Sequence, residues 1–227
     1  DTGSYLQRSL ENGKIVVLEA QLGAMRDIDY GIFPYTSSSS TISAYGPIGA
    51  GIPGEQLDHV VGVLKAYSTC VGAGPFIAEH AMPESWMESL RSAGCEYGAA
   101  TGRPRRVGPF DVVASRYGLK CQNADKIALT KLDVLSKFDE IPVITGYRQD
   151  GVLLDSFDPM IDLDSCEPVI KYLPGWSSGI STCRSWNELP ENAKAYVSFI
   201  EEQLDHEIQF VSVGAERDQY IMKGEWL

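Results

Sequence analysis

Runs of apolar residues along the chain predict several β-strands. Residues 14–20 (KIVVLEA) and 126–130 (KIALT) are short and aliphatic, which is typical of strands buried in a sheet. Two longer runs, 140–148 and 152–157, flank Asp150-Gly151, a residue pair that favours a tight hairpin turn. Two further strands are expected at residues 168–173 and 207–213.

Apolar positions three and four residues apart predict helices between these strands. In residues 55–66 (EQLDHVVGVLKA), Leu57, Val60, Val61 and Leu64 would share one face of a helix. Residues 83–93 start with a proline and end before Gly94, as helices commonly do. Further helices are expected at residues 4–12, closed by Gly13, and at residues 110–122 and 189–204.

Strands that alternate with helices predict an α/β fold with a central, mostly parallel sheet, helices on its faces and a β-hairpin extension. No Pro- or Gly-rich linker and no internal repeat divides the chain, so we expect a single α/β body over residues 1–227. The uncharged stretch between Asp29 and Glu55 is long enough to cross a bilayer, but its prolines, glycines and serines indicate a loop.

Charge and cysteine content narrow the function classes. Nineteen Lys+Arg against 31 Asp+Glu give a net charge of −12, which repels nucleic-acid backbones and anionic membranes, so we expect neither partner. The start of the chain lacks the basic and apolar segments of a signal peptide. Five cysteines without a CxxC spacing indicate reduced thiols and a cytoplasmic protein, and three scattered histidines argue against a zinc site.

The first chemically informative pattern is Thr130-Lys131-Leu132-Asp133, which ends a predicted strand. Ligands of open α/β sheets bind beyond the carboxyl ends of strands. A carboxylate there can accept hydrogen bonds from both the ring N–H and the exocyclic amine of guanine, while the lysine stem lies along the base. A surface ion pair at the strand end is the alternative.

The second pattern is a glycine- and arginine-rich loop, residues 98–106 (GAATGRPRR). From Gly98 to Lys120 there are five basic residues against Asp111, a local charge of 5 − 1 = +4 in an acidic chain. Guanidinium groups and a threonine hydroxyl suit phosphate or carboxylate ligands. The alternative is a solvated basic turn that balances the acidic surface.

Other polar loops follow predicted strands, and several common catalytic motifs are absent. Gln21 and the serine run that begins at Ser37 could contact a base edge or a phosphate, and residues 212–214 end the last strand with a glycine. The sequence lacks a GxxxxGK[ST] phosphate loop, GxGxxG, GxSxG and HExxH. The chain therefore offers binding groups without a complete catalytic constellation.

Taken in order, several motifs resemble the adenylosuccinate synthetase family. The similarity runs from about Lys14 to Asp218 and corresponds to the C-terminal half of that fold. The motifs are EAQ (19–21), DIDYGIFPYTSSSST (27–41), LKAYSTCVGAGPF (64–76), EYGAATGRPRR (96–106), LTKLDVL (129–135), LPGWSS (173–178) and VSVG (211–214).

The resemblance implies a cytoplasmic, homodimeric ligase of purine biosynthesis that joins IMP to L-aspartate with GTP and Mg²⁺. In the family an Asp removes the N1 proton of IMP, O6 attacks the γ-phosphate of GTP, and the aspartate amine then displaces the phosphate. The phosphate loop, the catalytic Asp and His and the Mg²⁺ ligands are expected in an N-terminal half that this sequence lacks. The isolated chain is therefore expected to be inactive.

The resemblance also implies, from their positions in the motifs, which residues would bind each substrate. Gln21, Ser37 and Arg103 would contact IMP, and Arg105 would face GTP. The aspartate loop would comprise Gly98, Ala99, Ala100, Thr101, Gly102, Arg103, Pro104 and Arg105. GTP would further be held by Lys131, Leu132, Asp133, Ser212, Val213 and Gly214.

The chain departs from the family pattern at several of these places. The usual Gly after the Gln is Leu22, with an extra residue before Asp27, and the usual Arg of STRVGAGPF is Cys70. Two alternatives follow: a synthetase for another purine nucleotide such as dGMP, with GTP or ATP as the co-substrate, or a non-catalytic nucleotide-binding module. The remaining departures are Ser37 for Thr, Ala100 for Thr, Pro104 for Arg, and Val213 and Ala215 for the Thr and Pro of STGP.

Overall fold

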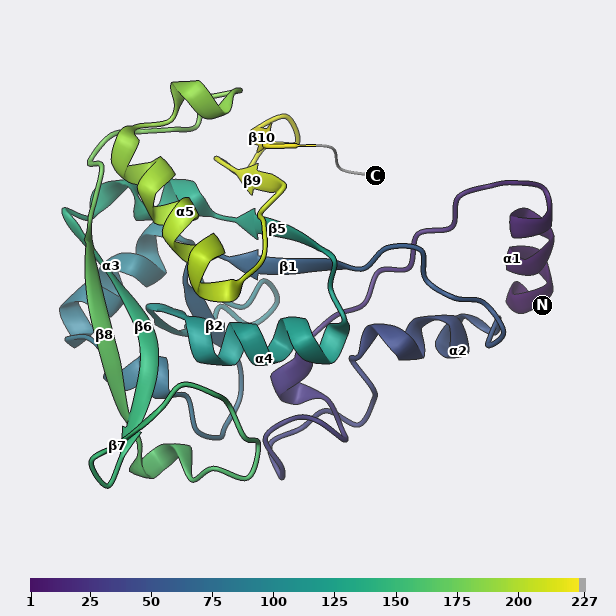
Figure 1. The fold of residues 1–227 in the computed structure, drawn as a ribbon, viewed down its shortest axis with the longest axis horizontal. Helices are drawn as coiled ribbons and strands as arrows, with labels where there is room; N and C mark the ends of the chain where they lie inside the picture. Colours follow the sequence, from purple (N-terminus) through teal and green to yellow (C-terminus); the bar gives the residue numbers. More distant parts are fainter. Residues whose placement is uncertain (225–227) are drawn as a thin grey trace.

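The first sheet has three parallel strands and one antiparallel strand, in the order β1-β5-β9-β10, in a computed structural model that describes residues 1–224 (Figure 1). The strands are β1 (Val61–Lys65), β5 (Lys126–Thr130), β9 (Phe210–Ser212) and β10 (Tyr220–Met222). Lys65 pairs with Thr130, and Leu129 pairs with Val211. The carboxyl ends of the three parallel strands therefore lie at one edge.

A second, mixed sheet is built around the long strand β6 (Glu140–Gln149). Strand β4 (Phe110–Asp111) pairs with it in parallel, whereas β7 (Val152–Leu154) and β8 (Glu167–Pro174) pair antiparallel. The predicted hairpin around Asp150-Gly151 is confirmed, and it belongs to this sheet. A separate pair joins β2 (Ser68–Cys70) to β3 (Arg106–Gly108).

Helices occupy most of the positions that the sequence predicts. The helix predictions for the segments of α1, α3, α4 and α5 are confirmed, with ends shifted by a few residues. The α-helices are α1 (Thr2–Glu11), α2 (Gly46–Ala50), α3 (Glu84–Ala93), α4 (Val112–Gln122) and α5 (Glu191–Leu204). Single 3-10 turns are η1 (Ala24–Arg26), η2 (Ser43–Tyr45), η3 (Ile77–His80), η4 (Leu132–Lys137), η5 (Leu163–Ser165) and η6 (Trp186–Glu188). Within residues 1–224, every helix is too short or too polar to traverse a bilayer.

The main core lies between the first sheet and the helices beside it. Ile127, Leu129 and Val211 of the strands and Val197 and Ile200 of α5 are fully buried in one cluster. A smaller cluster under the second sheet includes Ile144 and Tyr147. This arrangement confirms the α/β fold class and the mostly parallel sheet, although the strands form two larger sheets rather than one.

Residues 14–20 do not form the predicted buried strand. Figure 1 shows them running between α1 and the body as a chain segment without regular structure, while α1 and α2 lie to one side of the sheets. Ile15 and Val17 are 89% and 83% exposed. A strand is stabilised only by hydrogen bonds to a neighbouring strand, and no other segment of residues 1–224 pairs with this one.

The predicted helix over residues 55–66 is also wrong, because its second half forms strand β1. Three valines at 60, 61 and 63 favour an extended backbone, and pairing with β5 satisfies the strand. A Cβ at Gly62 would lie 2.6 Å from the Leu119 side chain, so the glycine allows α4 to pack closely on β1.

Candidate functional site

The carboxyl edge of the first sheet brings together groups that are far apart in the sequence. Lys65, Thr130 and Ser212 end the three parallel strands, so residues 131–133 and 213–214 follow at the same edge. The turn η4 contacts β9 there. Ligands of open α/β sheets bind at such an edge, and the residues expected to hold GTP meet at this place.

Lys131 and Asp133 have different surroundings at this edge. Lys131 has a left-handed backbone, with φ of 61°, and its Nζ donates to the Gly94 carbonyl at 2.6 Å and to Glu96 Oε1 at 3.1 Å. Burial raises the pKa of the Asp133 carboxyl, and the charge of Lys131 opposes that rise. The Leu132 and Val213 side chains are packed in the core, and the Val213 backbone N donates to Gln219 O at 2.9 Å.

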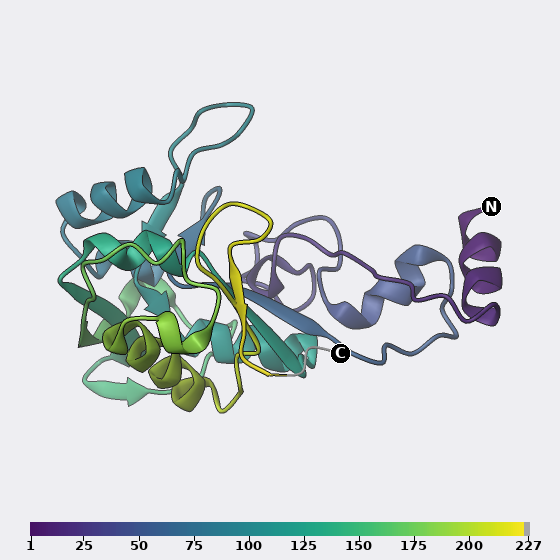
Figure 2. The same cartoon turned by 90° about the horizontal axis from the view of Figure 1, so that it is seen from above.

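The arginine-rich segment forms a narrow turn between α3 and β3. Tyr97 and Pro104 pair as a β-bridge, Gly98 N donates to Arg103 O at 2.8 Å, and Gly102 N donates to Gly98 O at 2.7 Å. Gly102 has φ of +64°, a conformation that glycine adopts without strain. Figure 2 shows this turn projecting from the body, beside α3. Its tip, residues 99–104, is exposed.

The two arginines expected to bind ligands lie at opposite ends of this turn. Arg103 is exposed at the tip, and its guanidinium makes no hydrogen bond or ion pair within residues 1–224. Arg105 lies at the base, where its NH1 donates to Glu96 Oε2 at 2.8 Å and its backbone N donates to Glu96 O at 2.9 Å. Arg103 is thus available to a ligand, while Arg105 is held in place.

Glu96 was missed by the sequence interpretation, and it joins the turn to the strand ends. Its side chain is 0% exposed and accepts hydrogen bonds from Tyr67 OH at 2.6 Å and Lys65 Nζ at 3.0 Å, in addition to Lys131 and Arg105. The available signal was a lone acidic residue just before a segment with two glycines and three arginines, residues 98–106. The local charge was counted from Gly98 and so excluded it.

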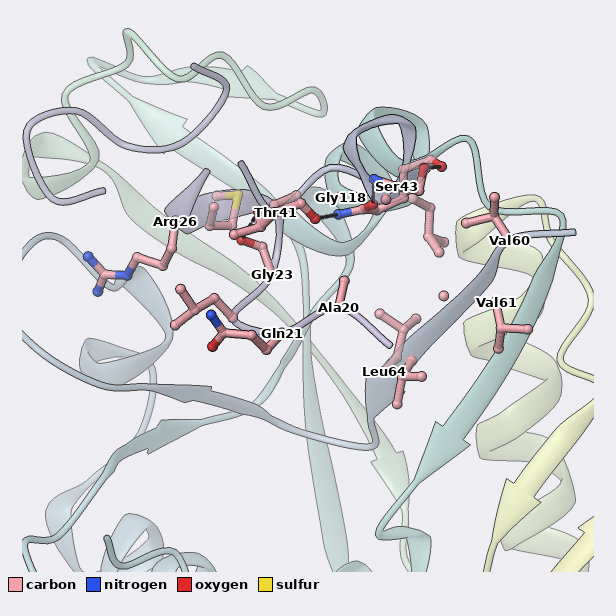
Figure 3. A pocket seen from close by; sticks show the side chains of 18 of the residues that line it. Ala20, Gln21, Gly23, Arg26, Thr41, Ser43, Val60, Val61, Leu64 and Gly118 are labelled. Carbon is pink, nitrogen blue, oxygen red and sulfur yellow. Dashed lines mark hydrogen bonds between the residues drawn. The ribbon is translucent and has the colours of Figure 1, made fainter. Parts of the chain in front are cut away.

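A cavity of about 1,880 Å³ opens between residues 14–26 and strand β1 (Figure 3). Gln21 is exposed and lines it, together with Val61 and Leu64 of β1 and Gly118 of α4. Apolar atoms form most of its lining surface. Polar and charged side chains from several segments, such as Arg26, Asp58 and Lys65, also line it.

Ser37 does not line this cavity. It lies in a loop that is held by the side chains of Arg26, which is half-buried, and Asp27, which is buried. Its Oγ donates to Ser39 O at 2.9 Å, and its N donates to Arg26 O at 2.7 Å. The guanidinium of Arg26 donates to the carbonyls of Val71 and Ala73 and to Cys70 Sγ. Because Cys70 pairs with Arg106 across β2 and β3, the Ser37 loop is linked to the arginine-rich turn.

Asp27 is the second feature that the sequence did not reveal. Burial alone would raise the pKa of its carboxyl, but hydrogen bonds from the backbone of Thr41, Asp29 and Tyr30 and from the Ser40 hydroxyl lower it below the usual value. These bonds close the loop over residues 27–41. Within residues 1–224, no group of three or more acidic, histidine or cysteine side chains is placed to hold a metal ion.

Comparison with known proteins gives consistent matches to one family. The family described as adenylosuccinate synthetase matches residues 1–221. Adenylosuccinate synthetase of Anaeromyxobacter sp. (strain K) is 41% identical over 224 residues, which are 98% of this chain and 51% of that protein. The enzyme of Trichlorobacter lovleyi is 44% identical over 223 residues, again 98% and 51%.

Two solved structures are similar to the fold. Fully ligated adenylosuccinate synthetase from Plasmodium falciparum matches with a TM-score of 0.93 and 39% identity, over 99% of this chain and 54% of that one. Cyanophage S-2L succinoaminodeoxyadenylate synthetase bound to dGMP and dATP matches with a TM-score of 0.58 at 14% identity, which shows a shared fold alone. The chain spans about half the length of the curated relatives it matches.

Proposed function

The chain belongs to the adenylosuccinate synthetase family, and from this we propose that it forms the guanine- and aspartate-recognising part of a GTP-dependent ligase of purine biosynthesis. The complete protein would join IMP to L-aspartate. The observation that carries the proposal is the assembly of Asp133, Lys131 and the arginine-rich turn at one sheet edge, joined by Glu96. Acceptors for guanine and donors for anions thereby lie side by side.

Each expected ligand has a chemical reason for its role. Asp133 offers two acceptor oxygens to the adjacent N–H groups of guanine, an arrangement that adenine cannot satisfy. Arg103 and Thr101, at the exposed tip of the turn, offer donors to the carboxylates of aspartate. Arg105 and the backbone at Ser212 and Gly214 would face the nucleotide. Gln21 and Ser37, with Arg103, would contact IMP.

Proton transfer and Mg²⁺ coordination require residues from the rest of the protein, and the structure offers a place for that polypeptide. The cavity of about 1,880 Å³ exceeds the ~300–1,000 Å³ of ordinary ligand pockets. One edge of β1 pairs with β5, and within residues 1–224 no strand covers the other edge. The exposed Ile15 and Val17, together with Val63 of β1 itself, line the cavity. We propose that the half present in the relatives packs here and adds a strand to β1.

Complementation tests this packing. The chain alone should form no adenylosuccinate, whereas co-expression with the remaining half of the Anaeromyxobacter relative should restore turnover. Val63→Lys, at a side chain that is 68% exposed next to the open edge, should abolish complementation by burying a charge. Leu153→Lys, at a 59% exposed side chain of β7, is the matched control and should complement normally. Equal complementation by both variants would contradict the proposed packing of the other half against β1.

Base preference tests the function itself. The complete protein should use GTP in preference to ATP, and Asp133→Asn should reduce that preference by about 10-fold or more, because an amide donor then faces the donors of guanine. Steady-state kinetics with each nucleotide would measure it. Equal use of GTP and ATP by the unaltered protein would refute the guanine assignment.

The same assay separates the alternatives. Turnover with dGMP in place of IMP would favour a synthetase for another purine, and nucleotide binding without turnover would favour a non-catalytic module. Mg²⁺ dependence, a homodimer and a cytoplasmic location remain predictions.

A further inference from the structure

Glu96 is a single buried carboxylate among three cations from three segments. Lys65 ends β1, Lys131 follows β5, and Arg105 closes the arginine-rich turn. The carboxylate is 0% exposed, while the three basic side chains remain partly open to solvent. Within this ion-paired cluster, three positive charges against one negative charge leave an excess of 3 − 1 = +2, which the nearby Asp133 carboxyl partly offsets.

The three cations would repel one another without Glu96. Like charges a few ångströms apart repel one another more strongly at the effective dielectric of a protein surface than in bulk water. Burial alone would raise the pKa of Glu96, but hydrogen bonds from Tyr67, Lys65 and Lys131 lower it to about 2. The carboxylate is therefore ionised throughout the physiological range, and it gathers the cations where an anion can then meet the remaining charge.

The contacts of Lys131 link the ion pairs of Glu96 to base recognition. Its ammonium is occupied by Glu96 and by the Gly94 carbonyl, so the position of both ends of the side chain is fixed. The methylene stem is then held in one orientation two residues before Asp133. Arg105 is fixed by the second oxygen of the same carboxylate, so one group orients both the guanine side and the turn.

We propose that Glu96 is a positioning residue that couples guanine recognition to the aspartate loop by holding Lys131 and Arg105 in one geometry. The proposal rests on the proposed function and deepens it. A substitution at Glu96 should then weaken GTP and aspartate together, although Glu96 itself, being fully buried, contacts neither ligand.

The test uses the complete protein with Glu96→Gln and the more conservative Glu96→Asp. Glu96→Gln should raise the KM for GTP and the KM for aspartate by about 10-fold each and raise the KM for IMP less, because Gln21 and Ser37 would hold IMP independently of Glu96. Glu96→Asp keeps the charge but is one methylene shorter, so it should raise both KM values less. The GTP-over-ATP preference should fall in the same order. A purely structural defect would lower kcat through loss of folded protein and leave the KM values unchanged.

Glu201→Gln provides the matched control. Glu201 is another largely buried glutamate in an ion pair, with Lys223, and it also accepts from Ile208 N, away from the strand ends and the arginine-rich turn. It should leave all three KM values unchanged. If Glu96→Gln does not fold, Glu96→Asp decides: unchanged GTP and aspartate KM values overturn the proposal.

Direct binding of GTP, measured by calorimetry, distinguishes a failure of the proposed function from a failure of the Glu96 proposal. If the unaltered complete protein binds no GTP, the proposed function fails and the Glu96 proposal falls with it. If the unaltered protein binds GTP and the Glu96 variants bind it equally well, only the Glu96 proposal is refuted. Weaker GTP binding by both Glu96 variants, with normal binding by Glu201→Gln, supports it.

Discussion

Residues 14–20 and residues 126–130 have similar sequences but different secondary structures. Both are short aliphatic runs that begin with Lys-Ile, yet the second is strand β5 and the first forms no strand. Ile127 is 0% exposed between β1 and β9, whereas Ile15 is 89% exposed. A strand pattern therefore indicates what a segment can form, and the presence of at least one neighbouring strand decides whether it does.

The two regions also differ in how they hold buried carboxylates. Asp27, in the N-terminal region, accepts hydrogen bonds from nearby backbone and hydroxyl groups within fourteen residues. Glu96, in the sheet body, is held by cations up to 35 residues away. Local donors close a loop, while distant cations join separate segments, so the second arrangement is the one that assembles a site.

The largest expected difference between the regions is in stability. Ile127→Ala should lower the free energy of unfolding by about 2–5 kcal/mol, because it leaves a cavity in a packed core. Ile15→Ala should change it by less than about 0.5 kcal/mol in this chain. Urea unfolding of both variants would measure the difference. A large loss in Ile15→Ala would break the comparison by showing that residue 15 is buried in solution.

The buried carboxylates sharpen the comparison through pH. The pKa of Glu96 is lowered to about 2 from 4.5, so its contribution to stability is complete above pH 4.5 and is lost as the pH falls towards 2. In Glu96→Gln, the decrease in the free energy of unfolding between about pH 4.5 and pH 2, on the order of 2–3 kcal/mol, should be absent. Unfolding curves between pH 7 and 3 would show it as a smaller pH dependence.

Asp111 should behave in the opposite sense. Burial raises its pKa to about 6 from 3.8, although hydrogen bonds from Ala114 N and Tyr147 OH oppose the rise. Its contribution is present below pH 3.8 and is lost as the pH rises through 6. Asp111→Asn should therefore flatten the change between pH 4 and 7 rather than the acid side. The same direction of change in both variants would contradict the assigned causes.

The smallest expected effect concerns the contact between the two regions. Gln122 of α4 accepts from Ser43 N at 2.6 Å and donates to Thr41 O at 2.9 Å. Gln122→Ala should lower the free energy of unfolding by about 1–2 kcal/mol. It should also increase the rate of proteolysis at the peptide bonds that follow residues 41–50. Gln149→Ala, which loses a single exposed hydrogen bond to Ser165, is the control and should leave the cleavage rate unchanged.

Segments with local instructions were predictable from the sequence alone. Strand β5 matches its predicted bounds, the turn at Asp150-Gly151 sets the register of β6 and β7, and Pro83 and Gly94 flank α3. The motif order also indicated the family, and Asp133 was located directly after a strand end. Apart from the motif order, these features depend on residues within a few positions of one another, so no tertiary information was needed.

Only the tertiary structure decided the remaining features. Residues 55–66 satisfy a helical spacing, but β5 offered hydrogen bonds that made their second half a strand, while residues 14–20 found no such partner. The importance of Glu96 depends on Lys65, 31 residues before it, and on Lys131, 35 residues after it. Strand pairing and charge clustering act over distances in space that the sequence does not display, so the geometry of the candidate site could be read only from the fold.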